Sequence, residues 1–155
     1  MTRLMLDSTT PAVLPVNVSL IAGYVNGRFR WSPAEWARFE SARQVRVNVT
    51  GQPGRGNCLD VESGDATASH APGWYDSIDW CPKDQLAIYC SRSSVQAVTA
   101  AMGGRDWRLW LATLDGSMPT TYLGRHVDAV QVIDLAKNGG PNIDVSFVLN
   151  DKWHA

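Results

Sequence analysis

Many short strand-like segments and little helical periodicity constrain the fold of this chain more than any other feature. Val45, Val47 and Val49 alternate with polar residues over Gln44–Thr50, a pattern typical of a strand with one apolar face. Seven further segments are predicted as strands, namely Leu4–Asp7, Leu20–Asn26, Asn57–Val61, Gln85–Cys90, Trp107–Leu114, Ala129–Asp134 and Ile143–Leu149. The sequence therefore predicts eight short strands.

Helical signals are confined to the region between the earlier strands. A serine followed by proline and an early acid predicts a helix over Ser32–Ala42. A second helix over Ser93–Met102 ends at two glycines. Ala66–Ile78 is expected to hold only a short helix, because it contains Pro72 and Gly73. The last three strands are joined by loops alone.

This order of elements favours an α/β fold. Alternating strands and helices followed by strands alone suggest a parallel sheet that closes through a less regular segment. The usual eightfold barrel needs at least ~200 residues, whereas this chain has 155. We therefore expect a single domain over 1–155, a compact, degenerate TIM-like (β/α) barrel with eight short strands and reduced outer helices. An open α/β sheet is the alternative.

Charge and cysteine usage narrow the classes of partner and cofactor. Fourteen basic and fifteen acidic residues give a net charge of -1, which favours neither nucleic acid nor an anionic membrane as a partner. The apolar run in Met1–Asp7 is too short for a signal peptide, so synthesis in the cytoplasm is expected. Cys58, Cys81 and Cys90 include no Cys-x-x-Cys pair, so no zinc site is predicted. Cys81 and Cys90 could pair under oxidising conditions.

Asp60 and Glu62 form the first candidate for chemistry. Two residues along a strand is one side-chain repeat, so both carboxylates would lie on one face, about 6.5 Å apart along the chain. Like charges at that distance raise the pKa of at least one of the two groups, which can keep a carboxyl group protonated as an acid. Glycoside cleavage uses such a pair. The structural alternative is a pair of acids at a turn, since Ser63 and Gly64 follow.

A set of short blocks, in order along nearly the whole chain, resembles the family 25 glycoside hydrolases, which are N-acetylmuramidases of bacteria and bacteriophages. The blocks are Leu-Asp-Ser at 6–8, Leu-Asp-Val-Glu at 59–62, Ile-Tyr-Cys-Ser at 88–91, Leu-Trp-Leu-Ala at 109–112, Val-Gln-Val at 130–132 and Ile-Asp-Val at 143–145. Gly23–Gly27 and Asp60–Thr67 are closer still to short glycoside-hydrolase-like proteins. Single blocks of this kind occur by chance, so their order carries the resemblance.

The resemblance implies five strand-helix units, three final strands and an active site at the carboxyl ends of the strands. Glu62 matches the general acid, and Asp60 matches the carboxylate that stabilises the positively charged sugar. Asp7 and Asp144 match two further acidic positions of the site. Asp144 lies near the amino end of its predicted strand, where it would face away from the site unless the strand started earlier.

The same resemblance implies a peptidoglycan or related polysaccharide substrate and no metal or cofactor. Tyr24, Tyr89 and Trp110 would stack on sugar rings, and Gln131 would bind substrate. The protein would act at the cell wall or as part of a virion. In a virion its partners would be other virion proteins.

The chain also departs from the family. It is shorter, and it has Val45–Thr50 where the family has a Tyr-His-Phe block, so part of the substrate groove is expected to be missing. Two hypotheses follow. The first is a muramidase-like hydrolase. The second is a protein that keeps the barrel and its acids for binding or assembly without catalysis, for example a virion component.

Overall fold

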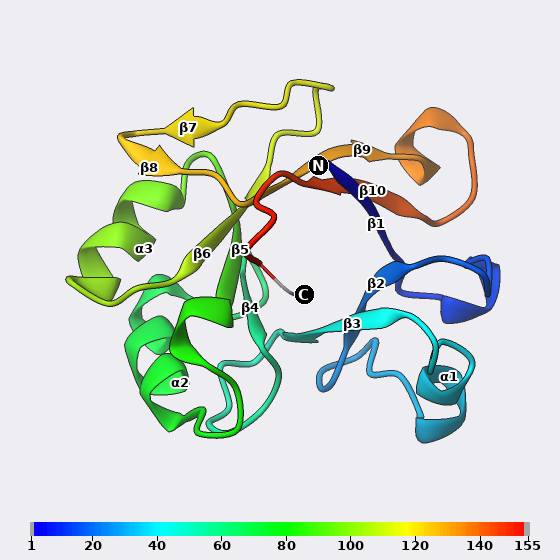
Figure 1. Cartoon of the computed structure of the whole chain (residues 1–155), viewed down its shortest axis with the longest axis horizontal. Coiled ribbons are helices and arrows are strands. Elements are labelled where there is room, and N and C mark those ends of the chain that lie inside the picture. Colours follow the sequence, from blue (N-terminus) through cyan, green and yellow to red (C-terminus); the bar gives the residue numbers. More distant parts are fainter. Residues whose placement is uncertain (1, 154–155) are drawn as a thin grey trace.

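Eight strands form a closed barrel in the computed structural model, which describes residues 2–153 (Figure 1). They are β1 (Arg3–Asp7), β2 (Leu20–Tyr24), β3 (Arg43–Asn48), β4 (Cys58–Val61), β5 (Ala87–Ser91), β6 (Arg108–Ala112), β9 (Ala129–Asp134) and β10 (Asp144–Val148). Their order around the barrel is β1-β10-β9-β6-β5-β4-β3-β2. The expected eight-stranded barrel is confirmed, and the open sheet is excluded.

The barrel is mixed rather than wholly parallel. Neighbouring strands run parallel from β1 through β6 to β9, whereas β10 is antiparallel to both β9 and β1. The expectation of a parallel sheet is therefore wrong at the last strand. The physical reason is the connection from β9 to β10, which is a loop with one short 3-10 turn at Ala136–Asn138. A parallel connection would need a longer crossover.

The helices are few, short and unevenly placed. They are α1 (Pro33–Ala37), α2 (Ala71–Ser77) and α3 (Val95–Met102). Figure 1 shows α2 and α3 together beside β4, β5 and β6, with α1 near β3 on the other side. The helices do not alternate regularly with the strands. The helix predicted over Ser32–Ala42 begins with the expected serine cap, which Glu35 completes as a capping box, but it ends earlier, at Ala37.

A small hairpin was not among the predicted elements. Strands β7 (Thr121–Tyr122) and β8 (Arg125–His126) form a separate two-stranded sheet. Leu123 and Gly124 join them with φ values of 47° and 78°, as a two-residue hairpin turn with two positive φ angles requires. Strands of two residues are too short to show alternation in the sequence.

Alternation along each barrel strand separates an inner core from an outer one. In β5, Ala87 and Tyr89 belong to the inner cluster, whereas Ile88 and Cys90 belong to the outer cluster that includes residues of α2 and α3. Trp153 also joins the inner cluster.

The three cysteines are free thiols, Cys58 and Cys90 being buried and Cys81 half-buried. Cys81 and Cys90 are therefore not paired in this structure. No helix within residues 2–153 has the length and apolar content needed to cross a membrane.

Candidate functional site

A small cavity lies at the carboxyl ends of the parallel strands. Nine residues line it: Asp7, Tyr24, Val47, Asp60, Glu62, Tyr89, Trp110, Gln131 and Asp144. Eight of the nine are the residues predicted from the sequence, and Val47 is the addition. They come from β1, β2, β3, β5, β6, β9, β10 and the end of β4. The fold therefore brings the whole predicted set together.

The position of Asp144 corrects one expectation. Asp144 is the first residue of β10, and its Cα partner across the barrel closure is Asp7, the last residue of β1. Because β10 is antiparallel to β1, its amino end lies at the same rim as the carboxyl ends of the other strands. Asp144 therefore faces the site without any earlier start of the strand.

Buried aromatic and polar side chains form the floor of the cavity. The rings of Tyr89 and Trp110 meet edge to face with centroids 4.9 Å apart, and the Tyr89 hydroxyl donates a hydrogen bond to Gln131 Oε1. The indole N–H of Trp110 donates to Ser146 Oγ at 3.1 Å. Tyr89 is 8% exposed and Trp110 is 3% exposed. Both rings thus pack against each other and offer little free face for stacking.

The cavity itself is too small for a sugar ring, but it joins wider grooves. Its volume is about 70 Å³, enough for a few water molecules. A groove of about 390 Å³ shares Tyr24, Asp60 and Glu62 with it, and a second of about 350 Å³ runs from Glu62 to Ser94. Ligand sites usually have volumes of ~300–1,000 Å³. Glu62 borders all three spaces, so a sugar in either groove would lie beside it.

Several groove residues were not predicted from the sequence. Phe29, with 46% of its surface exposed, and Arg28 line the groove beside Tyr24. Ser91 and Ser93 line the second groove. They lie at the end of β5 or in loops, where no alternation marks which side chains face a site. A polar loop that follows a predicted barrel strand was the only available signal.

Asp7 and Asp60 are the most deeply buried acids of the site. Their exposed fractions are 4% and 6%. Asp7 Oδ2 and Asp60 Oδ1 have no hydrogen-bond partner within the described chain. Burial raises the pKa of both carboxyl groups well above the ordinary range, and neighbouring acids raise each further. The neutral, protonated form of each is therefore favoured over a wider pH range than for an exposed aspartate.

Glu62 and Asp144 are half-buried and also hold protons more strongly than usual. Burial raises the pKa of Glu62 above its usual range. Burial, followed by the charge of Asp134, raises the pKa of Asp144 to about 6. A carboxyl group that keeps its proton near neutral pH can donate it to a leaving oxygen. Glu62 combines a raised pKa with direct access to both grooves.

A turn brings a third acid towards the pair. The Asp65 N–H donates to the Glu62 carbonyl at 3.1 Å, and Gly64 has a φ of 95° that favours glycine. Carboxylate oxygens of Asp60, Glu62 and Asp65 lie within 4.8 Å of one another. Together they could hold an oxygen-preferring cation. Spacing of this kind is common among exposed acids, and it carries no metal assignment by itself.

Comparisons of the chain with family models, with curated proteins and with solved structures found no match.

Proposed function

We propose that this protein hydrolyses a cell-wall glycan in the manner of a muramidase, with Glu62 as general acid. The observation that carries the proposal is the position of Glu62 at the junction of the small cavity and both grooves. A glycan strand that lies along the grooves would place a glycosidic oxygen beside this carboxyl group. The raised pKa of Glu62 supports proton donation to that oxygen.

Asp60 is proposed to stabilise positive charge on the sugar in its ionised form, which a positive charge developing beside the carboxyl group favours. It borders the wider groove as well as the cavity, and its carboxylate approaches that of Glu62 within 4.8 Å. Asp7 and Asp144 line only the cavity. We propose that they act through the electrostatic field on Asp60 and Glu62, because a sugar ring in the groove does not reach them.

The groove residues support specific substrate contacts. Phe29 offers the exposed ring on which a sugar face could stack, with Tyr24 beside it. Tyr89, Trp110 and Gln131 are proposed to hold the floor in place. In this proposal the barrel is a reduced member of the (β/α) barrel class that has lost most of its outer helices. The place of action is the cell wall, reached directly or on a virion.

The decisive experiment measures the release of reducing sugar from purified peptidoglycan. We expect Glu62→Gln to lower the rate by about a hundredfold or more, as loss of a general acid does. Glu40→Gln is the matched control, because it makes the same chemical change at an exposed position near α1. Thermal unfolding of each variant shows that it is folded. Turnover that survives Glu62→Gln would contradict the proposed role.

The second candidate is a glycan-binding or structural protein without turnover. The small volume of the cavity and the buried rings of Tyr89 and Trp110 favour it, because they leave no deep sugar cleft at the strand ends. Co-sedimentation with insoluble peptidoglycan separates the two candidates. Binding without sugar release, by a folded protein with Glu62 intact, supports the second candidate and excludes the first.

A further inference from the structure

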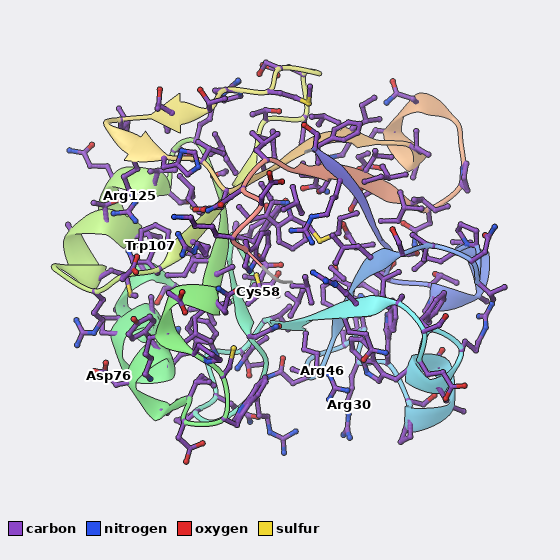
Figure 2. All side chains as sticks on the ribbon, in the orientation of Figure 1. Arg30, Arg46, Cys58, Asp76, Trp107 and Arg125 are labelled. Carbon is purple, nitrogen blue, oxygen red and sulfur yellow. The ribbon has the colours of Figure 1, made fainter. Side chains whose placement is uncertain are left out.

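Another groove, here called the outer groove, lies on the outside of the barrel, apart from the acidic cavity and the two grooves that adjoin it. It runs between α1 and the outer side of β3, and its volume is about 430 Å³. Three arginines line it, Arg30, Arg46 and Arg55, together with Trp31 and Trp36. Figure 2 shows Arg30 and Arg46 close together beside α1. None of these residues borders the acidic cavity.

The charge in this groove is unbalanced. No acidic side chain lines it, and the three arginines take part in none of the ion pairs found within residues 2–153. Glu35, the acid on α1, is held in its capping box, where Ser32 N and Oγ donate to Oε2 at 2.6 and 2.8 Å. Three uncompensated guanidinium groups therefore create a local positive potential on a protein whose net charge is -1.

One wall of the groove is rigid. Trp31 is 2% exposed, and its indole N–H donates to the Ser8 carbonyl at 3.1 Å. A Cβ atom added to Gly23 would lie only 2.7 Å from the Trp31 ring, so the ring packs directly on the β2 backbone. The Arg46 guanidinium lies 5.1 Å from the centre of the Trp36 ring. Trp31 thus holds a fixed position, and the neighbouring ring of Trp36 supports Arg46.

Arg46 keeps donors available to a ligand. Its Nη2 donates to Gln44 Oε1 at 3.2 Å, and the stack on Trp36 occupies one face of the guanidinium plane. A guanidinium has five N–H donors in one plane. The remaining donors can form paired hydrogen bonds with an anion that has several oxygens.

The backbone at Arg55 is anchored in the same region. Its carbonyl accepts hydrogen bonds from Trp74 Nε1 at 2.8 Å and from Asn48 Nδ2 at 3.0 Å. A Cβ atom at Gly56 would lie 2.4 Å from the Arg46 carbonyl oxygen, so the loop is pressed against β3. These contacts fix the point from which the Arg55 side chain extends into the groove.

The groove continues into a second depression. This depression has a volume of about 290 Å³, shares Arg46 and Arg55 with the first, and is bordered by Trp80, which is 54% exposed. Arg46 and Arg55 therefore stand between two connected spaces. An elongated ligand with more than one anionic group would match this arrangement better than a single small anion.

We propose that this groove, defined by Arg30, Arg46 and Arg55, binds an elongated ligand that carries two or more phosphate groups. A phosphate group presents several oxygens and up to two charges to the planar guanidinium donors. The half-buried ring of Trp36 forms an apolar wall for the part of the ligand that joins the phosphates. The inference goes beyond glycan hydrolysis, because it concerns another face of the barrel.

The test is calorimetric titration of the whole protein with inorganic tripolyphosphate at low ionic strength. We expect saturable binding that weakens as salt is added. Arg30→Gln, Arg46→Gln and Arg55→Gln should each lower the affinity by about tenfold. Arg43→Gln is the matched control, since Arg43 is exposed on the same strand as Arg46 but lines neither depression. Its affinity should stay within about twofold of the unchanged protein.

Two outcomes would overturn the proposal. One is the absence of saturable binding, or equal loss of affinity in Arg43→Gln and the groove variants. The other is citrate binding as tightly as tripolyphosphate, which would assign the groove to carboxylates. Thermal unfolding identifies a variant that fails to fold. If Arg46→Gln fails to fold, Arg30→Gln and Arg55→Gln still test the proposal. No ring contact or hydrogen bond to the guanidinium groups of Arg30 and Arg55 is found among the described residues, so these two variants should fold.

Discussion

The two ends of the barrel use the same eight strands but differ in how they are closed. At the amino end, Trp153 is 1% exposed, donates to the Gln85 carbonyl at 3.2 Å, and accepts a hydrogen bond from Arg3 at its own carbonyl. At the carboxyl end, Asp7, Asp60 and their acidic neighbours lie around a cavity, and two buried oxygens lack partners. Packing therefore stabilises the amino end, whereas the burial of acidic groups without hydrogen-bond partners costs stability at the carboxyl end.

The comparison extends to buried aspartates at the two ends. Asp128 lies at the amino end and is 2% exposed, and both of its carboxylate oxygens accept hydrogen bonds. Its Oδ2 accepts the Leu109 N–H at 2.9 Å, its Oδ1 accepts Asn150 Nδ2 at 2.5 Å, and Arg108 lies 3.6 Å away. Asp60 is buried almost as deeply but has an oxygen without a partner. The same residue type is thus structural at one end and available for chemistry at the other.

The largest expected effect follows from opening the amino end. Trp153→Ala removes a buried side chain from the inner core and should lower the free energy of unfolding by about 3–5 kcal/mol. Urea unfolding measures the change. Trp80→Ala, at a position that is 54% exposed, is the control and should cost about 1 kcal/mol or less. Equal losses in the two variants would show that Trp153 does not close the barrel.

A smaller loss is expected from Asp128→Asn. In the variant, the side-chain NH2 group would face an N–H group that now donates a hydrogen bond to the carboxylate, so that one bond would be lost. The free energy of unfolding should fall by about 2 kcal/mol at pH 7. Chemical denaturation measures it. Asp115→Asn is the control, because Asp115 is half exposed and pairs with Arg92 at the surface. A loss no greater than in this control would contradict the role given to Asp128.

The same substitution at the carboxyl end should have the opposite sign. The pKa of Asp144 is about 6 in the folded protein and about 3.9 in an unfolded chain. The folded state therefore binds more protons between these values, and its stability falls as the pH rises through that window. Asp144→Asn removes this loss.

We expect Asp144→Asn to be more stable than the unchanged protein at pH 8 by about 1 kcal/mol, a figure reduced to allow for the exposed part of the side chain. Below pH 4 the advantage should disappear, because the carboxyl group is then protonated in both states. Thermal unfolding across the pH range measures the difference. A variant that is less stable at pH 8 would mean that the charge of Asp144 stabilises the barrel.

The sequence predicted which residues lie at the site better than it predicted the direction of the last barrel strand, β10. Alternation put Asp60 and Glu62 on one face, and this is a local property that a sequence carries. Tyr89 was expected in the site only through the resemblance to a known family. The direction of β10 depends on the length of a loop and on the strand it meets, which no periodicity records. Asp144 was therefore assigned to the right set of acids with the wrong expected orientation.

The roles of the rings were also beyond sequence patterns. Trp110 was predicted to stack on sugar, yet it is nearly enclosed by its contacts with Tyr89 and Ser146. Phe29 was not predicted, although it is the exposed ring beside the groove. Exposure depends on what packs above a ring, and that comes from distant parts of the chain. The outer groove could not be predicted for the same reason, since Arg30 and Arg55 come close to Arg46 only in the folded chain.

The antiparallel pairing of β1 with β10 also has a consequence for folding. Arg3 pairs with Val148 and Asp7 with Asp144, so the seam of the barrel joins segments from opposite ends of the described chain. Contacts between residues so distant in sequence form slowly, because a long loop must close first. During synthesis β1 has no partner on that side until β10 emerges. We therefore expect the acidic cavity to be among the last parts of the barrel to assemble.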